Sequence, residues 1–591
     1  MASLTDMRFL LHDVFSISDH YAGLNLAEPI DGAFVDAVLD EVHRFTEGEL
    51  APLNRSGDEQ GCRLENGEVT TPDGFKEAYR TYIDGGWAGL LGAPEYGGQG
   101  LPSSLGILLE ELMATANMAW TMYPGLSRGA MHALEAHGSE AQKQQFLTRL
   151  LSGEWTGTMC LTEPHAGSDV GLARTKAEPH ADGTYRITGT KIFISAGEHD
   201  MAENIVHLVL ARLADAPSGT KGISMFLVPK FDLDGTRNGV SCGAIEEKMG
   251  IHGNATCVLN FDGARGYLVG EENQGMRYMF TMMNSARLGV GLQGVCLAQR
   301  GFEASSAYAQ ERLQMRSLSG PKAPDQPADP IVVHPDVRRM LLTQRAFAEG
   351  GRALVYYASL LADTESLHPD DAARGQAGEL LDLLTPIVKG FLTEAGYEAV
   401  NEAVQIYGGH GFIRENGVEQ LVRDGRITLI YEGTTGIQGL DLLARKILMT
   451  QGKGLIQLVG EMKQTAEAVR AAVPELAEGL DSVSEEWAAM SMQLGGKAVE
   501  NPDEIGAAAV DYLFYSGYAT LAFMWARIAL SAHGALEGAD AGRAEYLQSK
   551  IDTARFYFAR ILPRTMAHRQ SLEAGGDSLM NICDGALLAA M

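Results

Sequence analysis

One carboxylate in this chain lies in a segment that suits acid–base chemistry. Glu432 belongs to Tyr431-Glu-Gly-Thr-Thr435, which follows a short apolar run. Gly433 permits a tight turn that can direct the Glu432 side chain into a cleft. A carboxylate held there can act as a general base toward a bound substrate. The alternative is an ordinary exposed carboxylate in a surface turn.

Two other segments gather small residues, hydroxyls and an aromatic ring. They are Met159-Cys-Leu-Thr-Glu-Pro-His-Ala-Gly-Ser-Asp-Val170 and Gly189-Thr-Lys-Ile-Phe-Ile-Ser-Ala-Gly197. Small residues let the backbone come close to a ligand, hydroxyls can bind a heteroaromatic rim, and a phenyl ring offers a flat apolar face. A loop between two strands would account for the same residues about as well as a shelf for a cofactor.

The composition limits the class of protein. A chain of 591 residues with 45% hydrophobic and 21% charged residues predicts several globular domains. The net charge of -29 disfavours nucleic acid as a partner. Six cysteines without paired spacing indicate reduced, mostly buried thiols.

Targeting signals and membrane segments are not expected. The opening MASLTDMRFLLHDVF lacks the layout of a secretory signal, which predicts a cytoplasmic protein. The apolar stretch Leu521 to Leu530 contains Arg527 and is shorter than the roughly 20 residues of a membrane span, so stable membrane insertion is not expected.

Hydrophobic periodicity predicts a mainly α protein with a central β domain. Helical spacing dominates up to about residue 152, short β-branched runs follow between 158 and 268, and helical spacing returns near 276. The proline-rich stretch 317–330 should interrupt the second helical region. The predicted domains are an N-terminal arm (1–32), an N-terminal helical domain (33–157), a central β domain (158–270), a helical bundle (271–452) and an additional C-terminal helical domain (453–591).

Five segments together resemble the signatures of the acyl-CoA dehydrogenase family. They are TEPHAGSDV at 162–170, KIFISAG at 191–197, EEKMGIHGNATC at 246–257, YGGHGF at 407–412 and YEGTTGIQ at 431–438. The resemblance covers roughly residues 40 to 450. It implies an N-terminal helical domain, a central β-barrel or sandwich and a four-helix bundle. The region from about 455 to 591 resembles the extension of longer members, which include 3-methylmercaptopropionyl-CoA dehydrogenases and mycobacterial long-chain enzymes.

The resemblance implies FAD as the cofactor and a homodimer as the functional unit. Arg312 resembles an arginine that reaches the FAD pyrophosphate of a neighbouring subunit, and the segment 405–409 resembles the helix end that cradles the adenosine across the dimer interface. Phe193 replaces the usual tryptophan against the flavin ring. The expected FAD contacts are Met159, Leu161, Thr162, Gly167, Ser168, Phe193, Ser195, Arg312, Gln405, Gly408, Gly409 and Thr434.

The implied reaction is the conversion of a medium- or long-chain fatty acyl-CoA to the trans-2-enoyl-CoA, as in fatty-acid β-oxidation. Glu432 would remove the α-proton, with its pKa raised by burial, while hydride passes to flavin N5. An electron-transfer flavoprotein is the expected acceptor. The expected substrate contacts are Ser168, Asn284, Arg287, Tyr431 and Gly433, with the acyl tail near Leu112, Trp120 and Tyr123.

Three alternatives remain open at this point. The substrate could be 3-methylmercaptopropionyl-CoA, or the enzyme could be an acyl-CoA oxidase that uses dioxygen. The third alternative is a non-catalytic flavoprotein that binds DNA, which the negative charge disfavours.

Overall fold

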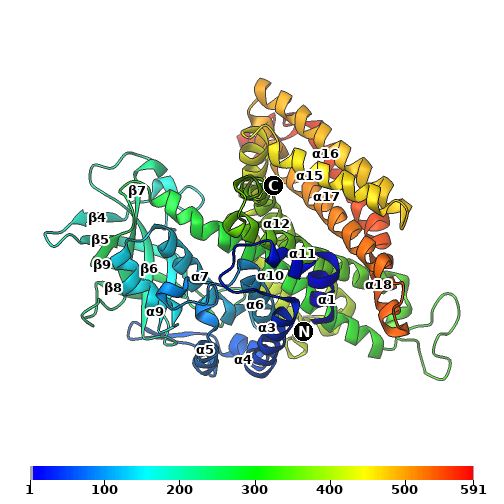
Figure 1. Cartoon of the computed structure of the whole chain (residues 1–591), viewed down its shortest axis with the longest axis horizontal. Helices are drawn as coiled ribbons and strands as arrows, with labels where there is room; N and C mark the ends of the chain where they lie inside the picture. Colours follow the sequence, from blue (N-terminus) through cyan, green and yellow to red (C-terminus); the bar gives the residue numbers. More distant parts are fainter. Residues whose placement is uncertain (1–3, 590–591) are drawn as a thin grey trace. The chain divides into compact units, whose positions relative to one another are not determined.

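The structure, a computed structural model, describes residues 4–589. The chain forms two compact units. We call Ala37–Gly289 the mixed unit, because it contains helices and the main sheet, and Met1–Asp36 together with Val290–Met591 the helical unit. Figure 1 labels helices and strands of both units.

The mixed unit is built around seven strands whose pairings close a ring. β6 pairs with β4 and β7, β5 joins β4 to β9, and β9 pairs with β7, so these five strands return on themselves. β3 adds to β6 in parallel and β8 adds to β9. A closed ring leaves few free strand edges. The strands are β3 (Trp155–Cys160), β4 (Lys176–Pro179), β5 (Tyr185–Ser195), β6 (Asn204–Arg212), β7 (Ile223–Pro229), β8 (Val240–Ile245) and β9 (Thr256–Leu268).

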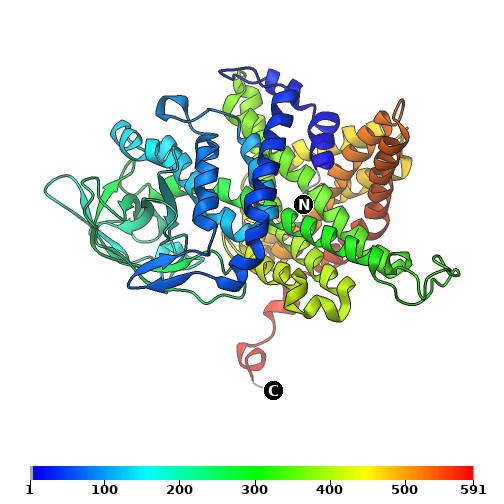
Figure 2. The same cartoon turned by 90° about the horizontal axis from the view of Figure 1, so that it is seen from below.

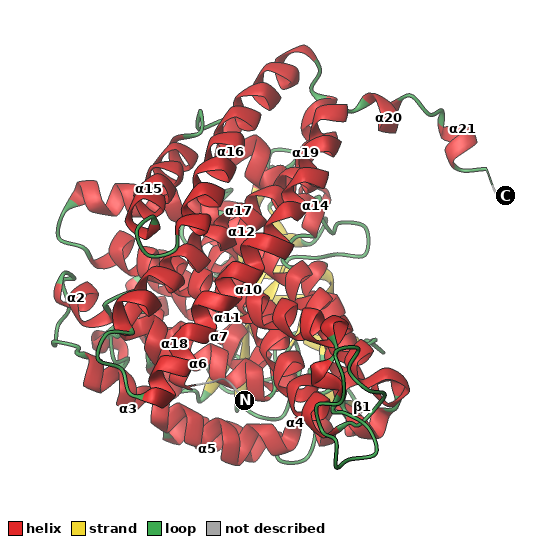
Figure 3. Cartoon of the chain, turned by 90° about the vertical axis from the view of Figure 1, so that its right-hand side faces the viewer, coloured by secondary structure: helices red, strands yellow, loops and turns green. Residues whose placement is uncertain are grey.

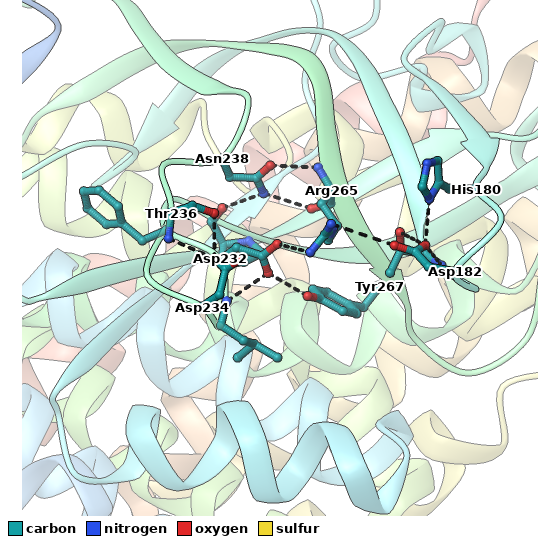
Figure 4. Close-up of polar contacts among 12 residues, drawn as sticks. His180, Asp182, Asp232, Asp234, Thr236, Asn238, Arg265 and Tyr267 are labelled. Carbon is teal, nitrogen blue, oxygen red and sulfur yellow. Dashed lines mark hydrogen bonds and ion pairs between the residues drawn. The ribbon is translucent and has the colours of Figure 1, made fainter.

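A polar network ties the connection between β7 and β8 to β9 (Figure 4). Asp232 accepts hydrogen bonds from the Arg265 guanidinium and the Tyr267 hydroxyl, each at 2.6 Å. Asn238 donates to the carbonyl oxygens of Pro229 and Arg265, each at 2.9 Å. The two bonds from Asn238 satisfy main-chain oxygens at the end of β7 and on β9. The network therefore fixes the rim of the ring.

Helices of the mixed unit pack on an aromatic core. Trp120 is fully buried, and the rings of Phe45, Tyr79 and Tyr82 lie within 6.5 Å of its centroid. The α-helices are α3 (Gly32–Phe45), α4 (Ala51–Gln60), α5 (Phe75–Asp84), α6 (Ser103–Ala116), α7 (Met118–His137), α8 (Glu140–Gln142) and α9 (Thr148–Leu151). The sequence did not predict the small hairpin of β1 (Arg63–Glu65) and β2 (Glu68–Thr70), although its Asn66-Gly67 turn is a strong hairpin signal.

The helical unit contains the bundle that carries the YEGTTGIQ segment. α10 (Gly275–Glu311) begins in the mixed unit and continues here. It is followed by α11 (Pro335–Leu367), α12 (Asp371–Tyr407), α13 (Val418–Gly425) and α14 (Thr435–Leu440). As predicted, no α-helix forms in 317–330. The buried Asp329 organises that loop by accepting hydrogen bonds from the main-chain N–H groups of Ser317, Lys322 and Ala323.

The region after residue 452 adds five main helices, of which four surround the buried α17. α17 contacts α11, α12 and α14 of the bundle and also its own neighbours α15, α16, α18 and α19. Figures 2 and 3 show the short final segments α20 (Asp577–Met580) and α21 (Asp584–Leu587) leading away from these helices. The main helices are α15 (Lys453–Val469), α16 (Pro474–Glu500), α17 (Asp503–Ala535), α18 (Ala541–Phe556) and α19 (Thr565–Ala574).

The N-terminal segment from Leu4 onward packs on this last region. α1 (Leu4–Arg8) leads into the π-helical turn Phe9–Val14, which contacts α17. The buried Asp6 forms ion pairs with Arg352 of α11 and Lys550 of α18, and it accepts a hydrogen bond from the Tyr546 hydroxyl at 3.2 Å. Two cations thus neutralise one buried carboxylate and join the arm to both helices.

The cysteines of the chain are free thiols. Four of the six cysteines are buried and none forms a disulfide, as predicted. Among residues 4–589, no helix is both long and apolar enough to pass through a bilayer. The same residues contain no group of three or more His, Cys, Asp or Glu side chains placed to hold a metal ion.

Candidate active site

Glu432 lies in a turn with an unusual backbone conformation. Its φ of 54° is in the left-handed region, and Gly433 follows with a φ of 93°. A left-handed conformation is unfavourable for a residue with a side chain and persists only where the surroundings hold it. Thr434 then caps α14, because its hydroxyl accepts a hydrogen bond from the N–H of Ile437 at 3.3 Å. The side chain of Glu432 is half-buried.

Two buried side chains bind the main chain of this turn. Gln438 of α14 donates to the carbonyl oxygen of Glu432 at 2.9 Å. Lys389 of α12 donates to the carbonyl oxygen of Gly433 at 2.6 Å. Both donor side chains are fully buried, so water does not reach them. The hydroxyl of Tyr431 donates to the side-chain oxygen of Gln293 on α10, which ties the start of the turn to a third helix.

In the mixed unit, the two segments expected to form a flavin shelf lie side by side. Met159 is on β3, Thr162 follows this strand, and the carbonyl oxygen of Thr162 accepts a hydrogen bond from the N–H of Ile192 on β5 at 3.0 Å. Phe193 has a φ of 58°, and 60% of its surface is exposed. An exposed aromatic ring on a strained backbone is typical of ligand sites. Ser195 is half-buried at the end of β5, and Leu161 is buried.

A buried ion pair joins these two segments. Lys191 binds Glu163 at 2.8 Å and also donates to the carbonyl oxygen of Leu161 at 2.9 Å. Glu163 further accepts hydrogen bonds from the main-chain N–H groups of Arg174 and Thr175. Burial alone would raise the pKa of Glu163, but Lys191 and these hydrogen bonds lower it to about 2. The carboxylate is therefore ionised at neutral pH.

The residues expected to contact the thioester and CoA are more dispersed. Gly167 and Ser168 are exposed in the loop after β3, and a Cβ atom at Gly167 would meet no other atom within 4 Å. Asn284 and Arg287 lie one turn apart on α10, where Asn284 is exposed and Arg287 is buried. Ser168, Asn284 and Arg287 belong to the mixed unit, whereas Tyr431 and Gly433 belong to the helical unit.

The residues expected at the FAD of a neighbouring subunit meet at one end of the helical unit. Arg312 follows the last residue of α10, and Gln405 lies exposed in the last turn of α12. The rings of Tyr308 and Tyr407 stack with centroids 4.1 Å apart, which brings the ends of these two helices together. The exposed Gly408 and Gly409 follow directly, and Gly408 has a φ of 59°.

The residues expected near the acyl tail are buried in the mixed unit. The indole N–H of Trp120 donates to the carbonyl oxygen of Phe75 at 3.1 Å, and the hydroxyl of Tyr123 donates to the carbonyl oxygen of Gly253 at 3.2 Å. Leu112, Trp120 and Tyr123 are all buried, with at most 2% of their surface exposed. Their polar atoms are thus satisfied within the mixed unit, which gives these side chains a structural role.

Sequence reasoning missed the residues that hold the two candidate segments. Lys191 occupies an inward position of β5, two residues after Gly189 and four after the buried Ile187, and a cation there predicts a buried partner. Lys389 is a single cation in the apolar run Leu383-Leu-Thr-Pro-Ile-Val-Lys-Gly-Phe-Leu392. A buried charge needs an acceptor. Both signals were present in the sequence, although neither identifies the acceptor.

Four family models match successive parts of the chain. They are the N-terminal domain (residues 35–154), the middle domain (158–264) and the C-terminal domain (273–448) of acyl-CoA dehydrogenase, followed by the acetyl-CoA dehydrogenase C-terminal-like model (458–582). The chain is also 44% identical over 554 residues to the 3-methylmercaptopropionyl-CoA dehydrogenase of Ruegeria pomeroyi, covering 92% of this chain and 93% of the relative. The chain belongs to the acyl-CoA dehydrogenase family.

Other members of the acyl-CoA dehydrogenase family match over nearly the full length. The broad-specificity linear acyl-CoA dehydrogenase FadE5 of Mycobacterium tuberculosis is 34% identical, with 99% of each chain covered. A crystal structure of an acyl-CoA dehydrogenase complexed with FAD from Bacillus anthracis has the same fold, with a TM-score of 0.74 at 22% identity over 94% of this chain and 90% of the other. The C-terminal helices therefore belong to an architecture found in other acyl-CoA dehydrogenases.

Proposed function

We propose that this enzyme dehydrogenates an acyl-CoA thioester between its α and β carbons, with Glu432 as the base that removes the α-proton. The observation that carries the proposal is the Glu432 turn. In it, the buried side chains of Gln438 and Lys389 donate hydrogen bonds to the carbonyl oxygens of Glu432 and Gly433. A general base must be held within hydrogen-bond reach of the proton it removes. A turn fixed in this way holds the main chain from which the Glu432 side chain extends.

The main chain of the same turn would assist the proton transfer. As the proton leaves the α carbon, negative charge develops on the thioester oxygen. The N–H of Glu432 would donate a hydrogen bond to this oxygen and stabilise the charge. Tyr431 and Gly433 flank the base and would contact the thioester, while Ser168, Asn284 and Arg287 would contact the rest of the substrate.

FAD is the cofactor, and when bound it accepts the hydride from the β carbon. The exposed ring of Phe193 and the half-buried hydroxyls of Thr162 and Ser195 fit the face and rim of an isoalloxazine. The exposed glycines 408 and 409 fit a close approach of the adenosine end. The remaining proposed contacts are Met159, Leu161, Gly167, Ser168, Arg312, Gln405 and Thr434.

We propose 3-methylmercaptopropionyl-CoA as the substrate. The support is the 44% identity with the Ruegeria pomeroyi enzyme over more than nine tenths of both chains. A straight medium- or long-chain acyl-CoA, which the sequence first favoured, has less support, since the relative with a linear acyl specificity is 34% identical. The two substrates differ by a sulfur atom and by length, which a pocket can distinguish only through several contacts.

The proposal also includes the electron acceptor and the oligomeric state of the enzyme. An electron-transfer flavoprotein would reoxidise the flavin, and two chains would form the functional unit, since Arg312 and Gly408 would serve the partner's cofactor. Peroxide release without an added acceptor would instead favour an oxidase. Tight duplex binding in a gel-shift assay at physiological salt would favour the DNA-binding alternative, which the net charge of -29 disfavours.

The test is anaerobic reduction of the bound flavin by a series of acyl-CoA thioesters. The series contains 3-methylmercaptopropionyl-CoA and straight chains of increasing length. We expect bleaching of the flavin absorbance, with the highest rate for the methylthio compound. Bleaching only by long straight chains would overturn the substrate, and absence of bleaching by every thioester would overturn the proposed reaction.

A further inference from the structure

The carbonyl oxygens of Glu432 and Gly433 each accept a hydrogen bond from a different helix. Lys389 belongs to α12 and Gln438 to α14, and both are fully buried. The direction in which the Cα–Cβ bond of Glu432 leaves the turn, relative to α14, depends on the main-chain dihedral angles at residues 432 and 433. Rotation of either peptide would break one of these hydrogen bonds and leave a buried donor without its carbonyl acceptor, which is unfavourable.

α14 is in turn held by a helix of the C-terminal region. A Cβ atom added at Gly439 would lie 2.5 Å from the carbonyl oxygen of Ala509 on α17, so the backbones of the two helices touch. α12 joins the same contact, because a Cβ atom at Gly390 would lie 2.6 Å from Leu513 of α17 and 3.0 Å from Gln438. The glycines at 390 and 439 therefore allow α12, α14 and α17 to meet behind the turn.

A buried lysine at this place needs an explanation beyond stability. A fully buried ammonium loses its hydration, and an apolar side chain of the same length would fill the space without that penalty. Lys389 reaches the main chain directly after the proposed base. Placement of a reacting group is sensitive to small displacements, since an error of about 1 Å can lower a rate by about 100-fold.

We propose that Lys389 and Gln438 are positioning residues for Glu432, and that α17 of the C-terminal region fixes their geometry by holding α14 against α12. The proposal rests on the proposed role of Glu432 as the base. It gives the C-terminal region a direct part in the reaction, because a displacement of α17 passes through Gly439 to the helix that follows the turn. Neither positioning residue needs to touch the substrate.

The experiment compares three variants of the full-length holoenzyme with a matched control. Lys389→Met removes the donor and keeps the length of the side chain. Gln438→Met does the same on α14, and Gly439→Ala pushes α14 away from α17. Gly436→Ala is the control, because a Cβ atom there meets only the hydroxyl of Thr434, the N-cap of the same helix, at 3.9 Å. FAD content, the limiting rate of flavin reduction and the substrate Kd are measured for each.

We expect the three variants to retain FAD, to lower the limiting rate of reduction by about 10- to 100-fold and to change Kd by less than about threefold. Hydrogen–deuterium exchange of the amides in 430–440 should be faster than in the native enzyme, which is a readout independent of turnover. Gly436→Ala should stay within about twofold of the native rate. Native rates and native exchange in Lys389→Met and Gly439→Ala would overturn the proposal.

Two further measurements keep the outcome decisive. If Gly439→Ala fails to fold, Leu513→Ala on α17 removes part of the same contact without a clash and should lower the rate in the same direction. A Glu432→Gln variant is measured in parallel. If Glu432→Gln is inactive while Lys389→Met is reduced at the native rate, only the positioning role is wrong. If Glu432→Gln is reduced normally, the proposed function itself is wrong.

Discussion

The ammonium of Lys191 and the carboxylate of Glu163 lie 2.8 Å apart in the interior of the mixed unit, where neither side chain has more than 3% of its surface exposed. Lys191 also binds the carbonyl oxygen of Leu161. The pair therefore joins β5 to the segment after β3, which are the two segments proposed to carry the flavin.

Lys191→Met should destabilise the protein strongly. The substitution leaves the Glu163 carboxylate buried without its cation, which costs about 3–5 kcal/mol. The measurement is the free energy of unfolding from urea titrations. Lys176→Met on β4 is the control, because this lysine is exposed and should change stability by less than about 0.5 kcal/mol. Equal stability of both variants would contradict the role of the pair, and a second substitution, Glu163→Gln, should recover part of the loss.

The Glu163 carboxylate should make the free energy of unfolding depend on pH in the acid range. The folded state holds the pKa of Glu163 at about 2, below its ordinary value of 4.5. Its contribution to stability is therefore fully present above pH 4.5 and is lost as the pH falls from 4.5 toward 2. The difference in unfolding free energy between the native protein and Glu163→Gln should be constant from pH 7 to 5.5 and should shrink below pH 4.5. A difference that stays constant to pH 3.5 would show that Glu163 does not titrate in this way.

Glu432→Gln should retain FAD and bind substrate but lose flavin reduction. The amide keeps the size and the main-chain turn, yet it cannot accept the α-proton, so the limiting rate should fall by at least about 10²- to 10⁴-fold. Stopped-flow absorbance under anaerobic conditions measures this rate. Thr435→Val is a suitable control, since its hydroxyl donates to Glu394 at 2.6 Å on the neighbouring helix and is not proposed to touch the substrate.

Asp6→Asn should destabilise the helical unit far more than a similar change nearby. The buried Asp6 pairs with Arg352 and Lys550. Its loss removes the carboxylate from Arg352 and leaves Lys550 with Glu349 at 2.9 Å, with a cost of about 3–5 kcal/mol. Asp13→Asn is the control, because the Asp13 pair with Arg543 is partly exposed and is worth at most about 1 kcal/mol. Urea unfolding compares the two. Similar midpoints for both variants would mean that the buried cluster adds little.

Elements with a strong local signal could be predicted from the sequence. The β-branched runs of β5, β6 and β7 and the proline-rich break at 317–330 lie where the sequence predicted them. The turn at Glu432 was expected from Gly433, and both residues adopt left-handed conformations. These features depend on residues that are neighbours in the chain, so local physical chemistry is sufficient to find them.

Features that depend on tertiary packing could not be predicted in the same way. The partners of Lys191 and Lys389 are 28 and 44 residues away in the chain, so the spacing of residue types does not identify them. The surroundings of Trp120, an aromatic core and a main-chain acceptor, likewise come from distant parts of the chain. The β1–β2 hairpin is an exception, because its Asn-Gly turn is a local signal from which the hairpin could have been predicted.

The ion pair between Asp6 and Lys550 has a consequence for biosynthesis. The two residues are 544 positions apart, so at about 5–20 residues per second the ribosome makes Lys550 roughly 30–110 s after Asp6. Phe9, Leu10 and Leu11 pack against helices that are likewise translated near the end. During that delay the nascent chain exposes a hydrophobic segment and a carboxylate whose partner Lys550 is not yet made. Chaperones commonly bind new polypeptides in such a state.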